Sequence, residues 1–87
     1  MSQEKETPKT REEVLSLSLE ARIQEVMHYQ INIDNYTIAL EQISKLPSDE
    51  QAELSEFIQQ LTSLLASEKL EQKKAKIMLN VLKQQME

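Results

Sequence analysis

Apolar residues recur at alternating intervals of four and three along two stretches of the chain, one before and one after Pro47. This spacing is typical of the a and d positions of heptads, which form one stripe along a helix that packs against another helix. The positions before Pro47 are Leu15, Leu19, Arg22, Val26, Tyr29, Ile33, Tyr36, Leu40 and Ile43. Those after it are Leu54, Ile58, Leu61, Leu65, Glu68, Gln72, Ala75, Leu79, Leu82 and Met86. The pattern predicts two long helices, each with one buried seam.

Capping residues and Pro47 set the expected ends of these helices. Thr10 and Glu13 have the spacing of a capping box, and Ser18 is a rival start because residues 15–19 alternate as in a strand. Pro47 disfavours helical conformation before it and cannot donate a backbone hydrogen bond. Ser48 and Gln51 form a second possible capping box.

These boundaries predict an all-α fold, an antiparallel two-helix hairpin of coiled-coil type. We expect a disordered arm over residues 1–10 and one helical domain over 11–87. The helices would cover about 11–45 and 49–85, with a turn at 46–48. A strand alternative exists for residues 29–38, which alternate and are rich in β-branched side chains, although the chain has no glycine for a tight hairpin turn.

Closing the hairpin about Pro47 sets a register in which Leu40 faces Leu54. In this register Arg22, the polar interruption of the first seam, lies opposite Gln72 and within one turn of Glu68. We expect these three residues to form a polar layer that fixes the register at some cost in stability. The alternative is that Arg22 lays its stem on the seam and keeps its charge in water.

A second set of apolar residues lies outside both seams: Ile23, Met27, Ile31, Ile38, Phe57 and Leu64. Such breadth exceeds the needs of a two-helix coiled coil and suits a helix in a larger bundle. We therefore predict that these residues form either a homodimer interface, which would complete a four-helix bundle, or a contact surface for an unidentified partner protein.

Composition excludes several classes of function. The 87 residues carry 10 basic and 15 acidic side chains, and they include no glycine and no cysteine. Phosphate-binding glycine loops, disulfides and thiolate chemistry are therefore absent. A net charge of −5 opposes binding to nucleic acid or to anionic membranes. With no apolar run of membrane-spanning length and no signal-peptide pattern at the start, we expect a cytoplasmic protein.

Two motifs keep other functions open. Glu25 and His28 form a Glu-x-x-His motif, which in a dimer of hairpins would supply ligands for a ferritin-like di-metal site. The lysines between Lys69 and Lys83 form a stripe that suits weak nucleic-acid binding. A surface histidine and a solvated charged face are the competing interpretations. The absence of a base–nucleophile pair favours a non-enzymatic protein-interaction module, an adaptor, regulator or inhibitor with no cofactor.

Overall fold

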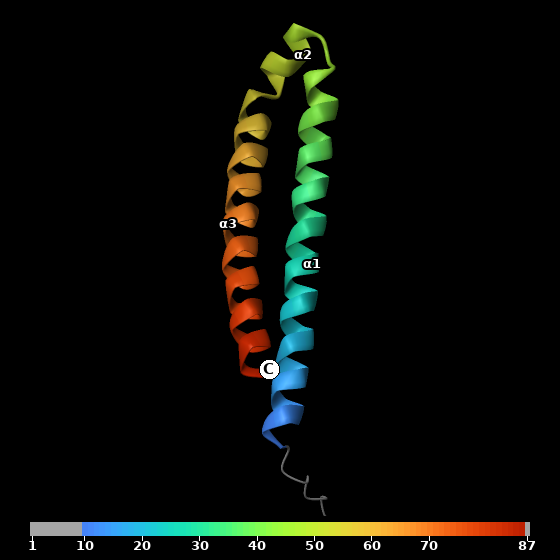
Figure 1. Cartoon of the computed structure of the whole chain (residues 1–87). Coiled ribbons are helices and arrows are strands. Elements are labelled where there is room, and N and C mark those ends of the chain that lie inside the picture. Colours follow the sequence, from blue (N-terminus) through green and yellow to red (C-terminus); the bar gives the residue numbers. More distant parts are fainter. Residues whose placement is uncertain (1–9, 87) are drawn as a thin grey trace, which may run out of the picture.

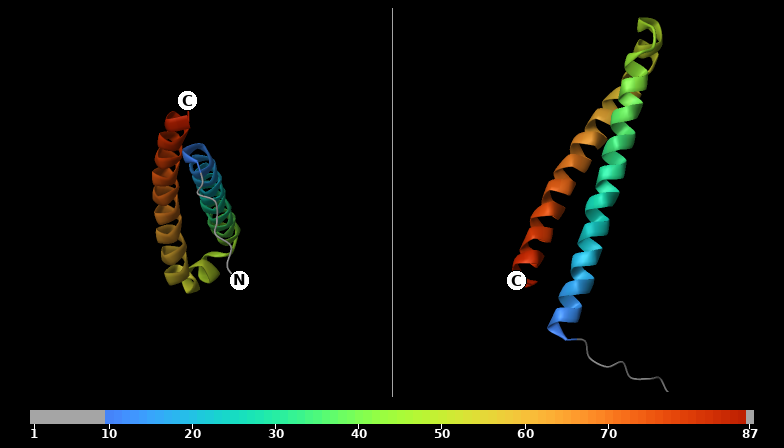
Figure 2. Two further views of the ribbon diagram at one scale, coloured as in Figure 1. Left: turned by 90° about the horizontal axis from the view of Figure 1, so that it is seen from below. Right: turned by 45° about the vertical axis from the view of Figure 1, so that its right-hand side comes forward.

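The computed structural model describes residues 10–86, and all secondary structure in this part of the chain is helical (Figure 1). Helix α1 spans Arg11–Ser44, α2 spans Ser48–Glu53 and α3 spans Ser55–Met86. The long helices α1 and α3 lie side by side and run in opposite directions, with α2 at the turn (Figures 1 and 2). The all-α prediction is confirmed. The predicted disordered arm falls outside the described residues, except for Thr10.

Helix α1 begins where its capping box predicts. The Thr10 hydroxyl accepts a hydrogen bond from the Glu13 backbone N–H at 3.1 Å, and the Glu13 carboxylate accepts one from the Thr10 N–H at 2.9 Å. The rival start at Ser18 is wrong, because α1 is already helical there. The strand alternative for residues 29–38 is also wrong, because this stretch continues α1 and buries Ile33 at helical spacing from its neighbours.

The turn differs from the prediction at Ser48. Pro47 occupies the N-cap position of α2, Ser48 is the first helical residue, and no side chain caps this end. The Gln51 side-chain amide turns back instead and donates to the carbonyl oxygens of Ser44 at 3.2 Å and Leu46 at 2.8 Å. Gln51 therefore satisfies the Ser44 carbonyl, which lacks a partner within α1, and the Leu46 carbonyl in the turn.

A second difference is a break at Leu54, since the sequence predicts one continuous helix over 49–85. The Leu54 backbone has φ −100° and ψ 14°, and its N–H donates to the carbonyls of Glu50 and Gln51 at 3.2 and 3.1 Å. The six residues of α2 thus form a separate short helix within the turn, and α3 starts at Ser55.

The buried residues follow the predicted seams. Six residues are buried in the described part of the chain: Leu15, Ile33, Ile43, Leu61, Gln72 and Ala75. All six occupy predicted a or d positions, and the other seam positions are half-buried except Met86, which is exposed. No large side chain among them is fully buried. The molecule measures 64 × 37 × 15 Å, so it is one layer of helices thick. No described helix is long and apolar enough to cross a bilayer.

The register between the long helices is displaced from the predicted one by about a heptad. Gln72 of α3 contacts Val26 and Gln30 of α1, which lie four and eight residues beyond the predicted partner Arg22. The physical reason is the length of the turn, because the pairing is centred on α2 rather than on Pro47. A shift of one heptad keeps every a and d position in the seam.

The turn gives a direct test of the two capping assignments. Gln51→Ala removes the amide that binds the Ser44 and Leu46 carbonyls and should lower the free energy of unfolding by about 1 kcal/mol. Ser48→Ala, the matched control, should change it by less than about 0.5 kcal/mol, since its hydroxyl caps nothing. Urea denaturation followed by circular dichroism measures both, and the reverse ranking would restore Ser48 as the cap.

Candidate interaction surface

The predicted polar layer assembles without Arg22. Arg22 forms an ion pair at 2.8 Å with Glu25 of its own helix, and both side chains are more than a third exposed. Such exposed pairs within one helix contribute only about 0.3–0.5 kcal/mol. Glu68 and Gln72 do contact α1, but through Asn32, Gln30 and the Val26 carbonyl.

Two hydrogen bonds across the helix pair identify its two faces. The Gln72 amide donates to the Gln30 side-chain oxygen at 2.9 Å, and the Asn32 amide donates to the Glu68 carboxylate at 2.8 Å. Gln30 and Asn32 are two residues apart, hence about 200° apart around α1, so they flank the seam on opposite sides. We name the two sides of the helix pair the Gln30 face and the Asn32 face.

Helical spacing assigns the exposed residues of α1 to these faces. Ile23 and Met27 lie seven and three residues before Gln30 and belong to the Gln30 face. Ile31 stands between Gln30 and Asn32 and therefore points away from α3. Ile38, seven residues later, does the same.

The same spacing divides α3. Lys69 and Lys76 flank Gln72 on the Gln30 face, whereas Leu64 and Glu71 flank Glu68 on the Asn32 face. Phe57 and Met78, each seven residues from these, belong to the Asn32 face as well. A shallow groove independently supports the assignment of Met78 to the Asn32 face. Glu25, seven residues before Asn32, lies on that face and lines this groove with Met78. The other residues of the groove are Ser18, Ala21, Arg22 and Leu82.

The six predicted interface residues are all exposed, with exposed fractions from 38% for Ile23 to 53% for Ile31. They do not form one surface, however. Ile23 and Met27 lie on the Gln30 face, Ile31 and Ile38 on the outer side of α1, and Phe57 and Leu64 on the Asn32 face.

Helix α3 carries six exposed apolar residues outside its seam, and some of them are not predicted from the sequence. These residues, which we name the α3 stripe, are Phe57, Leu64, Leu70, Ile77, Met78 and Val81. Phe57, Leu64 and Met78 belong to a row with seven-residue spacing, which Glu71 interrupts. Leu70 and Ile77 each come one residue before a position of this row. Accepting intervals of six as well as seven residues would have found Leu70 and Ile77 in the sequence.

The middle of the Asn32 face is polar. Ala21, Gln24, Glu25, His28, Tyr29, Asn32 and Glu68 line a shallow groove there. Partial burial raises the pKa of the Tyr29 phenol above its ordinary 10.0, and the carboxylates of Glu25, Glu71 and Glu68 raise it further. Tyr29 therefore stays protonated at neutral pH and keeps its hydroxyl as a hydrogen-bond donor.

Glu25 and His28 line this groove together with Glu68. Within residues 10–86, no group of three or more His, Asp or Glu side chains is arranged to hold a metal ion. Glu25 is already paired with Arg22. A di-metal site of the ferritin-like kind would require a second copy of the chain to supply the remaining ligands.

Gln72 gives a test of the polar seam. Gln72→Leu should raise the free energy of unfolding by about 1 kcal/mol, because Leu suits an apolar seam and the exposed Gln30 finds water instead. Gln72→Ala should lower it, because it leaves a gap in the seam. Chemical denaturation of both variants decides, and a destabilised Gln72→Leu protein would show that the hydrogen bonds to Gln30 and Val26 add net stability.

Comparison of the chain with protein-family models, with curated proteins and with solved structures finds no match.

Proposed function

We propose that this protein is a non-enzymatic interaction module, a small adaptor, regulator or inhibitor that acts through helix-face contact. The observation that supports it is the extent of exposed apolar surface. Among residues 10–86, thirteen large apolar side chains are 38% or more exposed, whereas five apolar residues are buried. Monomeric proteins rarely leave large continuous apolar surfaces in water, and such surfaces mark interaction sites.

The α3 stripe is the surface best suited to a partner protein. Its anchors Phe57 and Leu64 lie about two turns apart and Met78 about four turns further on, so all three share one side of the helix, as in helices that pack into a groove or complete a bundle. Phe57 supplies a large rigid apolar group, the kind of residue that dominates binding energy when a partner covers it. The partner that fits is a protein with an amphipathic helix or an apolar groove.

We further propose that the antiparallel coiled-coil hairpin forms a homodimer and thereby a four-helix bundle. A structure one helix layer thick, 15 Å in its shortest dimension, shields each seam from one side only. Chains of this size rarely reach several kcal/mol of stability on one small core, and association is a common remedy.

Sedimentation tests the dimer. At micromolar concentration the protein should sediment as a particle of twice the 10.1 kDa chain mass, with a helical circular dichroism spectrum. A folded particle of 10.1 kDa at every concentration would contradict the homodimer.

Charged substitutions test the α3 stripe. Leu64→Glu should weaken partner binding by about tenfold or more, equivalent to about 1.4 kcal/mol, because it places a carboxylate in an apolar contact. Helicity should stay unchanged, since Leu64 is 45% exposed. Asn80→Glu, at an exposed position of the same helix on the Gln30 face, is the control for added charge.

The measurement is affinity capture from the native host followed by mass spectrometry and titration of the captured protein. A partner retained equally by wild type, Leu64→Glu and Asn80→Glu would exclude the α3 stripe as the contact surface.

A further inference from the structure

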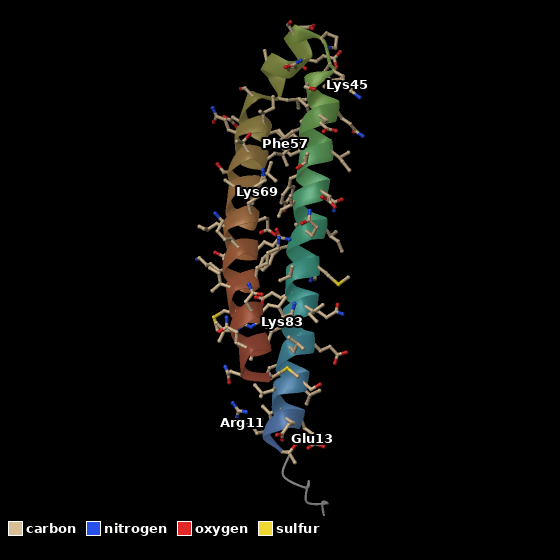
Figure 3. All side chains as sticks on the ribbon, viewed as in Figure 1. Arg11, Glu13, Lys45, Phe57, Lys69 and Lys83 are labelled. Atoms are coloured by element: carbon tan, nitrogen blue, oxygen red, sulfur yellow. The ribbon has the colours of Figure 1, made fainter. Side chains whose placement is uncertain are left out.

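Charge on the Gln30 face is segregated by helix. The α1 side carries carboxylates in one row of heptad spacing: Glu13, Glu20, Asp34 and Glu41. The α3 side carries lysines: Lys69, Lys73, Lys76 and Lys83. All eight side chains are exposed, and Lys69, Lys83 and Glu13 can be located on their helices in Figure 3. Among the described residues of this face, no cation stands in the acidic row and no carboxylate among the lysines.

These opposite charges do not pair within one chain. The ion pairs found between described residues are Arg22 with Glu25 and Lys74 with Glu71, each within one helix and away from the Gln30 face. Asp34 instead accepts a hydrogen bond at 2.9 Å from Gln30, which in turn accepts one from Gln72. Each residue of the acidic row comes directly after a seam position of α1. The row therefore points outward from the Gln30 face of α1, away from the lysines on α3 of the same chain.

We propose that the second copy in the homodimer packs on the Gln30 face, with its α1 over α3 and its α3 over α1. This inference rests on the proposed homodimer and specifies its geometry. Two face-to-face arrangements have two-fold symmetry. An axis parallel to the helices places the acidic row of each copy on the lysines of the other, whereas an axis across the helices stacks acidic row on acidic row. Like charges across an interface cost several kcal/mol, so the parallel axis is selected.

The register within one copy predicts which charges meet. The Gln30–Gln72 and Asn32–Glu68 contacts fix which residues of α1 and α3 lie at the same height, that is, at the same position along the helix axes. A two-fold axis parallel to the helices leaves these heights unchanged in the partner subunit. Asp34 then lies within a turn of Lys69 of the partner subunit, and Glu20 within a turn of Lys83 of the partner subunit. Helical side chains lean toward the N-terminus of their helix, which brings each pair closer.

This face also has apolar contacts to offer. Ile23 and Met27 lie between Glu20 and Asp34 on α1, at the height of Lys73 and Lys76 on α3. The four-carbon stems of lysine cover such residues while the ammonium groups reach the flanking carboxylates. The α3 stripe stays exposed on the other side, so the dimer and the partner protein use different faces.

Charge reversal tests this geometry. Glu20→Lys/Asp34→Lys and Lys69→Glu/Lys83→Glu should each raise the Kd of self-association by about tenfold or more, because each creates like-charge contacts. An equimolar mixture of the two variants should restore a dimer with one copy of each. Glu53→Lys/Glu56→Lys, with the same change in net charge as the first variant but off the Gln30 face, should leave the Kd near that of wild type.

Sedimentation of wild type, of each charge-reversal variant alone, of their mixture and of the control separates the proposed homodimer from its proposed geometry. A wild-type protein that is monomeric overturns the dimer and its geometry together. A wild-type dimer that neither reversal weakens overturns only the geometry.

The ends of the dimer provide a second test. The chain has no cysteine, so Ser48→Cys gives one labelling site in each turn. The parallel axis puts both turns at the same end, and spin labels there should be much closer than the 64 Å length of one molecule. A distance near that length would place the turns at opposite ends and overturn the proposed arrangement.

Discussion

The placement of α2 in the turn is the constraint on which the rest of the structure depends. Helix α1 ends at Ser44, shortly before Pro47. The Gln51 side-chain amide of α2 donates hydrogen bonds to the carbonyls of Ser44 and Leu46. The Leu54 N–H makes the last backbone hydrogen bonds of α2, so α2 is separate from the helix α3 that packs along α1. Pairing is then centred on α2, and this centre decides that Gln72 lies beside Gln30 and Glu68 beside Asn32.

The seams could be predicted from the sequence because heptad periodicity and burial both show which side of a helix packs against another helix. A residue at an a or d position is shielded whenever any helix packs on its stripe, so Leu15, Ile33 and Leu61 are buried as their spacing predicts. The register could not be predicted in this way. Moving one helix by a heptad returns every apolar residue to an equivalent site, and the apolar pattern alone cannot choose between the two positions.

The capping residues explain why the turn differs from the one that the sequence predicts. Ser48 and Gln51 have the spacing of a capping box, yet a glutamine amide near a helix end also donates well to free carbonyls of the preceding helix. Which bond forms depends on where the chain goes after Leu46, and this is tertiary information. The division of the exposed apolar residues has a similar origin. Periodicity shows that Ile23 and Leu64 lie outside their seams, but only contacts between the helices show that they lie on opposite faces.

Polar residues in the seam distinguish the two registers that the apolar residues leave equivalent. In the register centred on Pro47, Glu68 would face the apolar Val26, and its nearest donor would be Arg22, which the structure pairs with Glu25 of its own helix instead. In the observed register the Glu68 carboxylate accepts a hydrogen bond from Asn32, while Gln72 binds Gln30 and the Val26 carbonyl. An apolar residue at position 68 or 72 would pack well in both registers and remove this discrimination. The polar interruptions of the second seam thus act together with α2, and both favour the same alignment of α1 and α3.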